Sequence, residues 1–369
     1  MTKYIHEKQN WPDFTWDAAA LSKPLGAVHE LQERLLGRMA SLGFSLREEA
    51  NLQSLTEEAV KSSEIEGEIL NKDQVRSSLA RHLGIDIGAL TQADRNVEGI
   101  VAMLLDATQN SMKPLTVERL FGWHASLFPT GYSGLRKIAA GAWRKDRTGP
   151  MQVVSGPAGR EKVHFQAPPA TAVNAEMRKL LQWFNVYDGT DLILRAAIAH
   201  FWFVTIHPFE DGNGRIGRAL ADMMLARSEK SPQRFYSVSA QIRKERNDYY
   251  DTLERTQKGD LDVTEHLHWF LGCLGRAFEG ANTTLAEVLK KARFWETHRD
   301  TPFNTRQLLV LNRLLDGFEG KLSSSKWAKL AECSQDTAGR DIDDLVKRGI
   351  LKKDQAGGRS TSYSLIGKA

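Results

Sequence analysis

The chain has 369 residues, of which 41% are hydrophobic and 26% are charged, and its formal net charge at pH 7 is +4. This composition is ordinary for a soluble globular protein with room for two or three compact units. The N-terminal residues lack the apolar segment of a secretory signal, and no apolar run reaches the roughly eighteen residues of a membrane span, so we expect neither secretion nor membrane insertion. Cys273 and Cys333 are far apart, which argues against a disulfide framework or a zinc site and fits a reducing cytoplasm.

Helical patterns dominate the first part of the chain. Apolar residues recur at helical spacing until Gly43 ends the first pattern, and Thr116 is suited to cap a later one. We predict helices over residues 24–42, 52–70, 91–107 and 117–128. These segments indicate a mainly α-helical fold.

Residues 133–169 differ from their surroundings because they are rich in glycine and proline. Two short β-prone runs lie within them, at 151–155 and 163–166. We predict a β-hairpin that turns around residues 156–162.

The centre of the chain contains a glycine-rich segment between two predicted helices. Residues 192–206 are apolar at all but three positions, and their length favours a buried helix over a strand. Residues 216–227 are rich in Ala, Leu, Met and Arg, which favour a second helix. Residues 207–218 read HPFEDGNGRIGR, and their three glycines predict tight turns and a close approach of the backbone to a ligand.

A glycine loop that opens a helix predicts an anion site. The backbone N–H groups of Gly212, Asn213 and Gly214 are expected at a helix N-terminus, where the helix dipole favours negative charge. Arg215 and Arg218 are three residues apart, so both guanidinium groups can reach one polyphosphate.

Two further side chains suit phosphate chemistry at this loop. Asp211 offers a hard oxygen ligand for a Mg²⁺ ion that bridges phosphates. His207 titrates near neutrality and can take a proton from an incoming nucleophile.

Residues 212–217 also satisfy the GxGxxG pattern of dinucleotide-binding folds. That pattern needs a strand before the glycines and an acidic residue about twenty positions later. Here a helix is predicted before the glycines, and residues 233–238 read QRFYSV. The dinucleotide interpretation is therefore disfavoured.

Residues 207–218 match, at every fixed position, the HxFx(D/E)GNGRxxR signature of the Fic (Fido) family, which this chain resembles. The resemblance implies a Fic-type helical-bundle core that transfers AMP from ATP to a Ser, Thr or Tyr hydroxyl of a target protein and releases pyrophosphate. It implies that His207 is the catalytic base, that Asp211 binds Mg²⁺, and that the nucleotide is bound by Gly212, Asn213, Gly214, Arg215 and Arg218.

A second motif of the family precedes the first one. Residues 62–67 read SSEIEG and resemble the S-x-x-x-E-G inhibitory motif of Fic proteins, with Ser62 and Glu66 at its fixed positions. The resemblance implies that Glu66 pairs with Arg218 and takes the place of a phosphate oxygen.

The resemblance also assigns roles to two other segments. The hairpin at 151–166 corresponds to the flap, which holds the target segment by strand addition. The helix predicted over residues 239–257 corresponds to one beside the adenine, where Asn247 or Tyr250 could contact the base. A further helix is predicted over residues 264–278.

Residues 305–369 predict a separate unit. A helix, a helix-turn-helix and a glycine-tipped hairpin follow one another, which is the layout of a winged helix, and residues 337–345 resemble its recognition helix. Residues 301–369 hold 12 Lys and Arg against 8 Asp and Glu, so the net positive charge lies in this tail. However, the recognition helix contains four aspartates, which would face DNA phosphates unfavourably and argue against DNA contact. These are Asp336, Asp341, Asp343 and Asp344.

We therefore expect three parts: an N-terminal helical segment with the inhibitory helix (1–90), a Fic core with a β-hairpin flap (91–295) and a C-terminal winged-helix-like domain (296–369). The expected partners are ATP and a target protein docked on the flap, and a homodimer is also possible.

Two alternative functions stay open. One is an enzyme that removes AMP with Glu66 positioning water, and the other is a DNA-binding regulator whose Fic core senses nucleotide or dimerises. Retention of every motif residue argues against the second.

Overall fold

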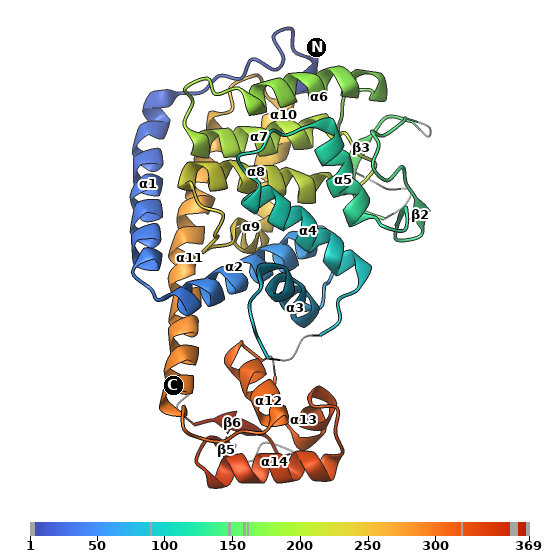
Figure 1. Cartoon of the computed structure of the whole chain (residues 1–369). Coiled ribbons are helices and arrows are strands. Elements are labelled where there is room, and N and C mark those ends of the chain that lie inside the picture. Colours follow the sequence, from blue (N-terminus) through green and yellow to red (C-terminus); the bar gives the residue numbers. More distant parts are fainter. Residues whose placement is uncertain are drawn as a thin grey trace. The chain divides into compact units, whose positions relative to one another are not determined.

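The computed structural model describes residues 4–88, 91–146, 149–157, 160, 162–318, 320–354 and 361–366. The chain is mainly helical and divides into two compact units (Figure 1). The first unit comprises Met1–Ile85 and Thr91–Thr284, and the second comprises Asp86–Leu90 and Leu285–Ala369. The N-terminal segment thus belongs to the same unit as the core, and the tail unit begins before the predicted residue 296.

The first unit consists of helices with two small hairpins. Its helices are α1 (Ala18–Ala40), α2 (Phe44–Ile65), α3 (Lys72–Leu83), α4 (Arg95–Gln109), α5 (Val117–Leu127), α6 (Ala170–Asn185), α7 (Leu192–Ile206), α8 (Asn213–Glu229), α9 (Val238–Lys244), α10 (Arg246–Lys258) and α11 (Thr264–Thr297), whose last turns belong to the second unit. A 3₁₀ turn (Ile5–Glu7) precedes them, and the strands are β1 (Tyr132–Ser133), β2 (Arg136–Lys137), β3 (Gln152–Ser155) and β4 (Lys162–Gln166).

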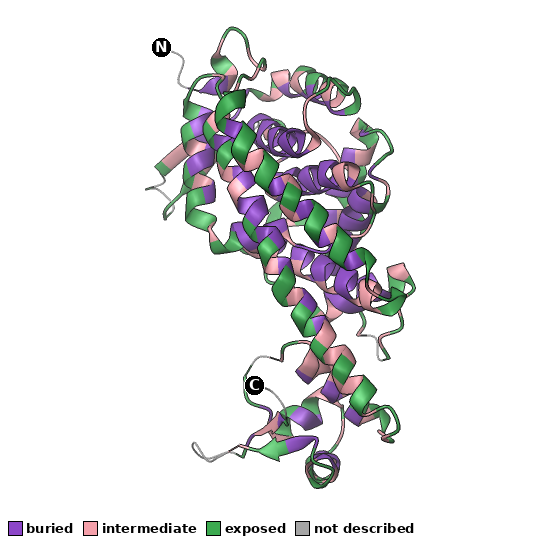
Figure 2. Cartoon of the chain, turned by 90° about the vertical axis from the view of Figure 1, so that its left-hand side faces the viewer, coloured by how far each residue is buried: buried purple, intermediate pink, exposed green. Residues whose placement is uncertain are grey.

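Helices α7 and α8 form the centre of this unit. Every residue of α7 from Ile193 to Ile206 is buried, as the purple central helices in Figure 2 show. The apolar run in the sequence is therefore explained by a helix covered on all sides. Helix α2 packs against α4, α8 and α9, which brings its C-terminal end to the start of α8.

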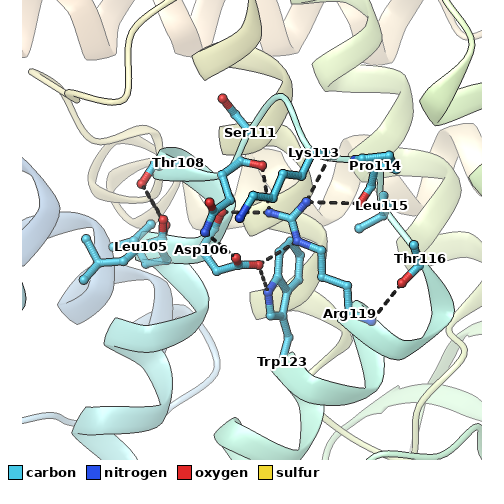
Figure 3. A network of polar contacts seen from close by, with 12 residues as sticks. Leu105, Asp106, Thr108, Ser111, Lys113, Pro114, Leu115, Thr116, Arg119 and Trp123 are labelled. Atoms are coloured by element: carbon cyan, nitrogen blue, oxygen red, sulfur yellow. Dashed lines mark hydrogen bonds and ion pairs between the residues drawn. The ribbon is translucent and has the colours of Figure 1, made fainter.

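The corner between α4 and α5 is fixed by one arginine (Figure 3). Arg119 donates to a carboxylate oxygen of Asp106 at 2.6 Å and to the backbone carbonyls of Asp106 and Asn110 at 2.8 and 3.1 Å. Trp123 donates its indole N–H to the same carboxylate at 2.7 Å. The guanidinium adds side-chain hydrogen bonds to carbonyl groups at the end of α4 that also accept from the backbone N–H groups of Asn110 and Lys113. This corner positions α5, whose C-cap residue Phe128 contacts the loop before α8.

Several predicted helix boundaries were wrong. Helix α1 begins at Ala18 instead of residue 24, and α2 spans Phe44–Ile65 instead of 52–70. The predicted helix over 239–257 is divided at Glu245, whose carboxylate accepts hydrogen bonds from Arg276 of α11 at 2.5 and 2.6 Å. This tertiary pairing has no local sequence signal, since neither glycine nor proline marks the break. Helix α8 begins three residues earlier than predicted, and α11 extends well beyond residue 278.

The second unit contains α12 (Thr305–Leu315), α13 (Ser324–Leu330), α14 (Gln335–Lys347), β5 (Leu351–Lys353) and β6 (Tyr363–Leu365). The strands pair antiparallel, and Trp327 is fully buried in a core formed mainly by α12, α13 and α14. The order of these elements agrees with the predicted order. The predicted glycine tip at 355–360 lies outside the described residues, and the winged-helix assignment stays a prediction.

Within the described part of the chain, none of the helices combines the length and the apolar character needed to cross a membrane. Cys273 is buried and Cys333 is partly buried, and both are free thiols.

Candidate functional site

The loop between α7 and α8 is held by its own side chains. His207 caps α7 in the left-handed conformation (φ 51°, ψ 57°), and its N–H donates to the carbonyl of Phe203 at 2.9 Å. Asn213 accepts a hydrogen bond from the Phe209 N–H and donates one to the Phe209 carbonyl, both at 2.9 Å. Gly212 has φ 78°, a conformation that suits glycine. These contacts make Asn213 the first residue of α8 and fix the direction of that helix.

Arg144 holds the same loop from outside, a role that no pattern in the sequence predicted. Its side chain is buried, its Nε donates to the carbonyl of His207 at 2.7 Å, and its backbone N–H donates to that of Pro208 at 2.9 Å. It also pairs with Asp146 at 2.6 Å and donates to the carbonyl of Pro168. One arginine therefore ties the loop to the segments on both sides of the β3–β4 hairpin.

The first turn of α8 forms a cradle for a negatively charged group. Its backbone N–H groups have no partner within the helix and carry the positive end of the helix dipole. A Cβ atom at Gly214 would lie only 2.0 Å from a carboxylate oxygen of Glu66, so only glycine leaves room for that oxygen. Of the three N–H groups predicted to face an anion, that of Gly212 instead donates to Asp211 at 2.6 Å.

Glu66 occupies this cradle from the end of α2. Its carboxylate pairs with Arg218 at 2.8 Å, so the expected ion pair is present. Ser62 accepts two further hydrogen bonds from Arg218, one at its hydroxyl oxygen (2.9 Å) and one at its carbonyl (2.7 Å). Burial, the largest single influence, would lower the pKa of Arg218, but Glu66 together with Tyr249 and Tyr250 raises that pKa above its usual value. The two fixed positions of the predicted inhibitory motif therefore hold the second motif arginine.

Glu68 pairs with the first motif arginine, a contact that the sequence analysis missed. Its carboxylate lies 2.5 Å from a terminal nitrogen of Arg215, whose guanidinium also lies over the ring of Phe128. The only available sequence signal was a second acid two positions after Glu66. Within the described residues, Nε of Arg215 and Nη1 of Arg218 have no acceptor, so each buried guanidinium can still bind an anion.

The imidazole of His207 is prepared to accept a proton. Its Nδ1 lies 3.2 Å from the carbonyl of Val204, which can only accept, so Nδ1 carries the hydrogen and Nε2 keeps its lone pair. Burial lowers the pKa of His207 to about 4, with a further lowering from Arg144, although Glu66 and Asp211 act in the opposite direction. The ring is therefore a neutral base at pH 7.

Asp211 fits a metal ion that is bound mainly through a substrate. One of its carboxylate oxygens accepts from the Gly212 N–H and the other from the hydroxyl of Ser133, and each oxygen retains a lone pair. Within the described part of the chain, no group of three or more His, Cys, Asp or Glu side chains could hold a metal ion. A single carboxylate together with phosphate oxygens and water is an ordinary Mg²⁺ environment.

The two residues expected near an adenine differ in their placement. Tyr250 lies at the site, with its hydroxyl 3.5 Å from the carbonyl of Ile65, directly before Glu66. Asn247 is exposed on α10. Arg246, which the sequence analysis missed, donates to the same Ile65 carbonyl at 3.2 Å and lies over the Tyr250 ring.

The predicted hairpin is present next to this site. Strands β3 and β4 pair antiparallel with a register irregularity between Val153 and Val154. Phe165 of β4 is buried against Tyr4 of the N-terminal arm, and His164 lies 2.5 Å from Glu254 of α10. The hairpin is thus fixed on the body of the first unit, and its role as a flap stays a prediction.

His124 supports the loop from behind and gives a testable pH dependence. Its ring stacks on Phe209, with ring centres 4.1 Å apart, and its Nδ1 accepts from the Gly141 N–H at 2.9 Å. Burial lowers the pKa of His124 from 6.5 to about 4. The stability that depends on the neutral ring is therefore complete above about pH 6.5 and is lost as the pH falls towards 4.

We expect the free energy of unfolding, measured with urea, to fall across this interval by up to about 1.4 kcal/mol per pH unit for His124. The variant His124→Asn keeps an acceptor but cannot titrate, so it should show a smaller slope than the wild type. An unchanged slope would show that His124 is not neutral in the folded state.

The fold and this loop together define a class of protein: a helical body whose central helix pair presents two buried arginines, a neutral histidine and a carboxylate around a helix N-terminus. Residues 114–225 match the model of the Fic/DOC family. The region that contains the motif is therefore similar to the Fic/DOC family, in agreement with the resemblance that the motif predicted. Residues 4–85 match a model described as a domain of unknown function, DUF4172.

Similar proteins support this assignment. A probable protein adenylyltransferase of Aquifex aeolicus is 30% identical over 28% of this chain, and protein adenylyltransferase fic-1 of Caenorhabditis elegans is 36% identical over 24%. The chain covers 30% and 17% of the length of these two relatives.

Solved structures show the same fold. A Fic family protein from Desulfovibrio desulfuricans G20 superposes with a TM-score of 0.54 at 21% identity and covers 97% of this chain and 99% of that one. A fragment of fic-1 from C. elegans has a TM-score of 0.51 at 22% identity and covers 74% of each chain.

Proposed function

We propose that this protein is an adenylyltransferase that moves AMP from ATP to a Ser, Thr or Tyr hydroxyl of a target protein, and that Glu66 keeps it slow at rest. The observation that carries the proposal is the Glu66 carboxylate itself. It lies over Gly214 at the start of α8 and 2.8 Å from Arg218, in a position suited to a phosphate oxygen. A site that binds a carboxylate in this way can bind a phosphate by the same contacts.

In this proposal the nucleotide replaces both carboxylates. Arg215 and Arg218 bind its phosphates through charge-assisted hydrogen bonds, together with the N–H groups of the first turn of α8. Asp211 would hold Mg²⁺, which supplies positive charge to the phosphates when it is bound. Tyr250 lies close enough to α2 to contact the base.

His207 acts on the nucleophile. Nε2 takes the proton of the target hydroxyl while the hydroxyl oxygen forms a bond to the α-phosphorus. The bond between that phosphorus and the oxygen that bridges to the β-phosphate breaks, and pyrophosphate leaves. Arg144 keeps His207 in place through its carbonyl. The exposed edge of the β3–β4 hairpin would align the target segment by main-chain hydrogen bonds.

The test is label transfer by the full chain. The Glu66→Gly variant is incubated with Mg²⁺ and ATP labelled at the α-phosphate, and protein-bound label is measured on the chain itself and on proteins of a cell extract. ATP labelled at the γ-phosphate is the matched control, because AMP transfer leaves no γ-phosphate on the protein. Label from the γ-position alone would identify phosphoryl transfer and overturn the proposal.

Glu68 should weaken nucleotide binding at rest, because its carboxylate competes with phosphate for Arg215. In the His207→Ala background, which prevents turnover, Glu68→Gln should bind ATP about tenfold more tightly, a change of about 1.4 kcal/mol. Glu64→Gln is the matched control, since Glu64 lies on the same helix end but pairs with Lys61. Equal affinities measured by calorimetry for the Glu68 and Glu64 variants would exclude this competition.

A further inference from the structure

The helix-turn-helix of the second unit has a surface that the proposed transfer reaction does not use. Helices α13 and α14 are joined by a four-residue turn and pack against one another, and α14 also packs against β5. Ser334 caps α14 by accepting from the Thr337 N–H at 3.2 Å. In helix-turn-helix proteins the second helix enters the DNA major groove and contacts bases with its N-terminal residues.

The sequence argued against DNA contact because α14 contains four aspartates, but the structure pairs two of them with arginines of the same unit. Asp341 is 6% exposed and accepts from Arg306 at 2.7 and 3.0 Å and from Asn304 at 2.9 Å. Asp344 is bound by Arg348 at 2.8 Å and by Gln307 at 2.8 Å. The carboxylate of Asp341 is buried and paired, and that of Asp344, whose side chain is 38% exposed, is paired with Arg348, so the negative charge of both is offset by cations of the same unit.

The side chains that remain exposed are mostly basic. Six exposed Lys and Arg side chains lie on the three packed elements: Lys326 and Lys329 on α13, Arg340 and Lys347 on α14, and Lys352 and Lys353 on β5. Within the described part of these elements and the turn, the exposed acids are Glu332, Asp336 and Asp343. The charge of this surface therefore complements a polyanion.

The residue types on α14 indicate which polyanion. Arg340 suits the acceptor pair of guanine in the major groove, and Gln335 suits adenine. Lysines on the neighbouring α13 and β5 suit phosphates on the flanking backbone. We propose that α14 docks in the major groove of duplex DNA, with the lysines of α13 and β5 on the phosphates.

The proposal is tested with the full chain and a fluorescent random-sequence duplex, by anisotropy over a salt series. Binding should weaken steeply with salt, and Lys326→Ala/Lys329→Ala, which lie one turn apart on α13, should reduce the slope of log K against log salt by about 2, because each phosphate contact contributes about 0.9. Lys244→Ala, on α9 of the first unit, should leave the slope unchanged. Selection of preferred duplexes should find a guanine whose preference is lost in Arg340→Ala.

A pair of aspartate variants gives a second measurement that does not depend on losing contacts. Asp343→Asn removes an exposed charge and should tighten duplex binding at low salt by about two- to fivefold. Asp341→Asn removes a charge that is already paired, so it should lower the melting temperature without tightening binding.

Absence of duplex binding at low salt, tighter binding to single-stranded RNA, or equal effects of the two aspartate variants would each overturn the proposal. None of these results would bear on AMP transfer, whose residues lie in the first unit.

Discussion

Replacing His207 with alanine should lower AMP transfer by about 10²- to 10⁴-fold and leave ATP binding nearly unchanged. The reason is that in the proposed mechanism Nε2 takes the proton of the nucleophile, whereas Arg215, Arg218 and the start of α8 bind the phosphates. Protein-bound label and ATP affinity are measured on the same preparation, in the Glu66→Gly background so that the starting rate is measurable. Transfer at an unchanged rate would remove His207 from the mechanism.

The pH profile provides a second check on the same residue. Because the pKa of His207 is about 4, its base form should be fully populated at pH 6 as well as at pH 7. The rate should therefore not fall with an apparent pKa near 6.5. A fall there that disappears in His207→Ala would show that the ring is solvated and charged more readily than its buried position indicates.

The sequence predicted those parts of the molecule in which a local pattern determines the structure. The apolar run at 192–206 has one stable solution, a helix buried on all sides, and α7 has those same bounds. Of the glycines after it, only Gly212 forms part of the turn, whereas Gly214 and Gly217 lie within α8, so the pattern predicted the helix start but placed it three residues too late. The pairing of Glu66 with Arg218 was predicted because two recognised motifs of one family specify it.

The contacts that sequence reasoning missed are tertiary pairings of common residues. Glu68, Arg144 and Arg246 each reach the site through a side chain whose partner is distant in sequence. Glu245, at the break between α9 and α10, likewise pairs with Arg276 on another helix. From sequence alone, a charged residue on a helix is predicted to face solvent. Helical periodicity does not show which distant residue it pairs with.

In α14 of the second unit, sequence reasoning also missed tertiary pairings, and here it underestimated how far the acidic side chains are neutralised. Four aspartates counted from sequence predicted repulsion, whereas the structure buries or pairs two of them. The net charge of a surface depends on which of its charged side chains are paired with others. Composition gives the total charge of a segment but does not show which side chains are paired.

Glu66→Gly should increase AMP transfer at least tenfold, which corresponds to about 1.4 kcal/mol of barrier. In the proposed mechanism, while Glu66 pairs with Arg218 the γ-phosphate lacks its anchor and the α-phosphate is poorly aligned for attack. Arg218 is 3% exposed, and a buried guanidinium without an anion is costly, so in the variant it should recruit the γ-phosphate. Label transfer from ATP at saturating concentration measures the change.

The gain from Glu66→Gly should disappear when Arg218→Ala is added, because relief acts only through the freed guanidinium. Lys61→Ala, elsewhere on α2, is the matched addition and should leave the gain intact, since Lys61 pairs with Glu64. A gain that survives Arg218→Ala would mean that Glu66 acts by blocking the cradle at Gly214 and not by holding the arginine. If Glu66→Gly instead abolishes removal of AMP from a modified protein and adds no transfer, Glu66 positions a water molecule, and the reaction runs in the hydrolytic direction.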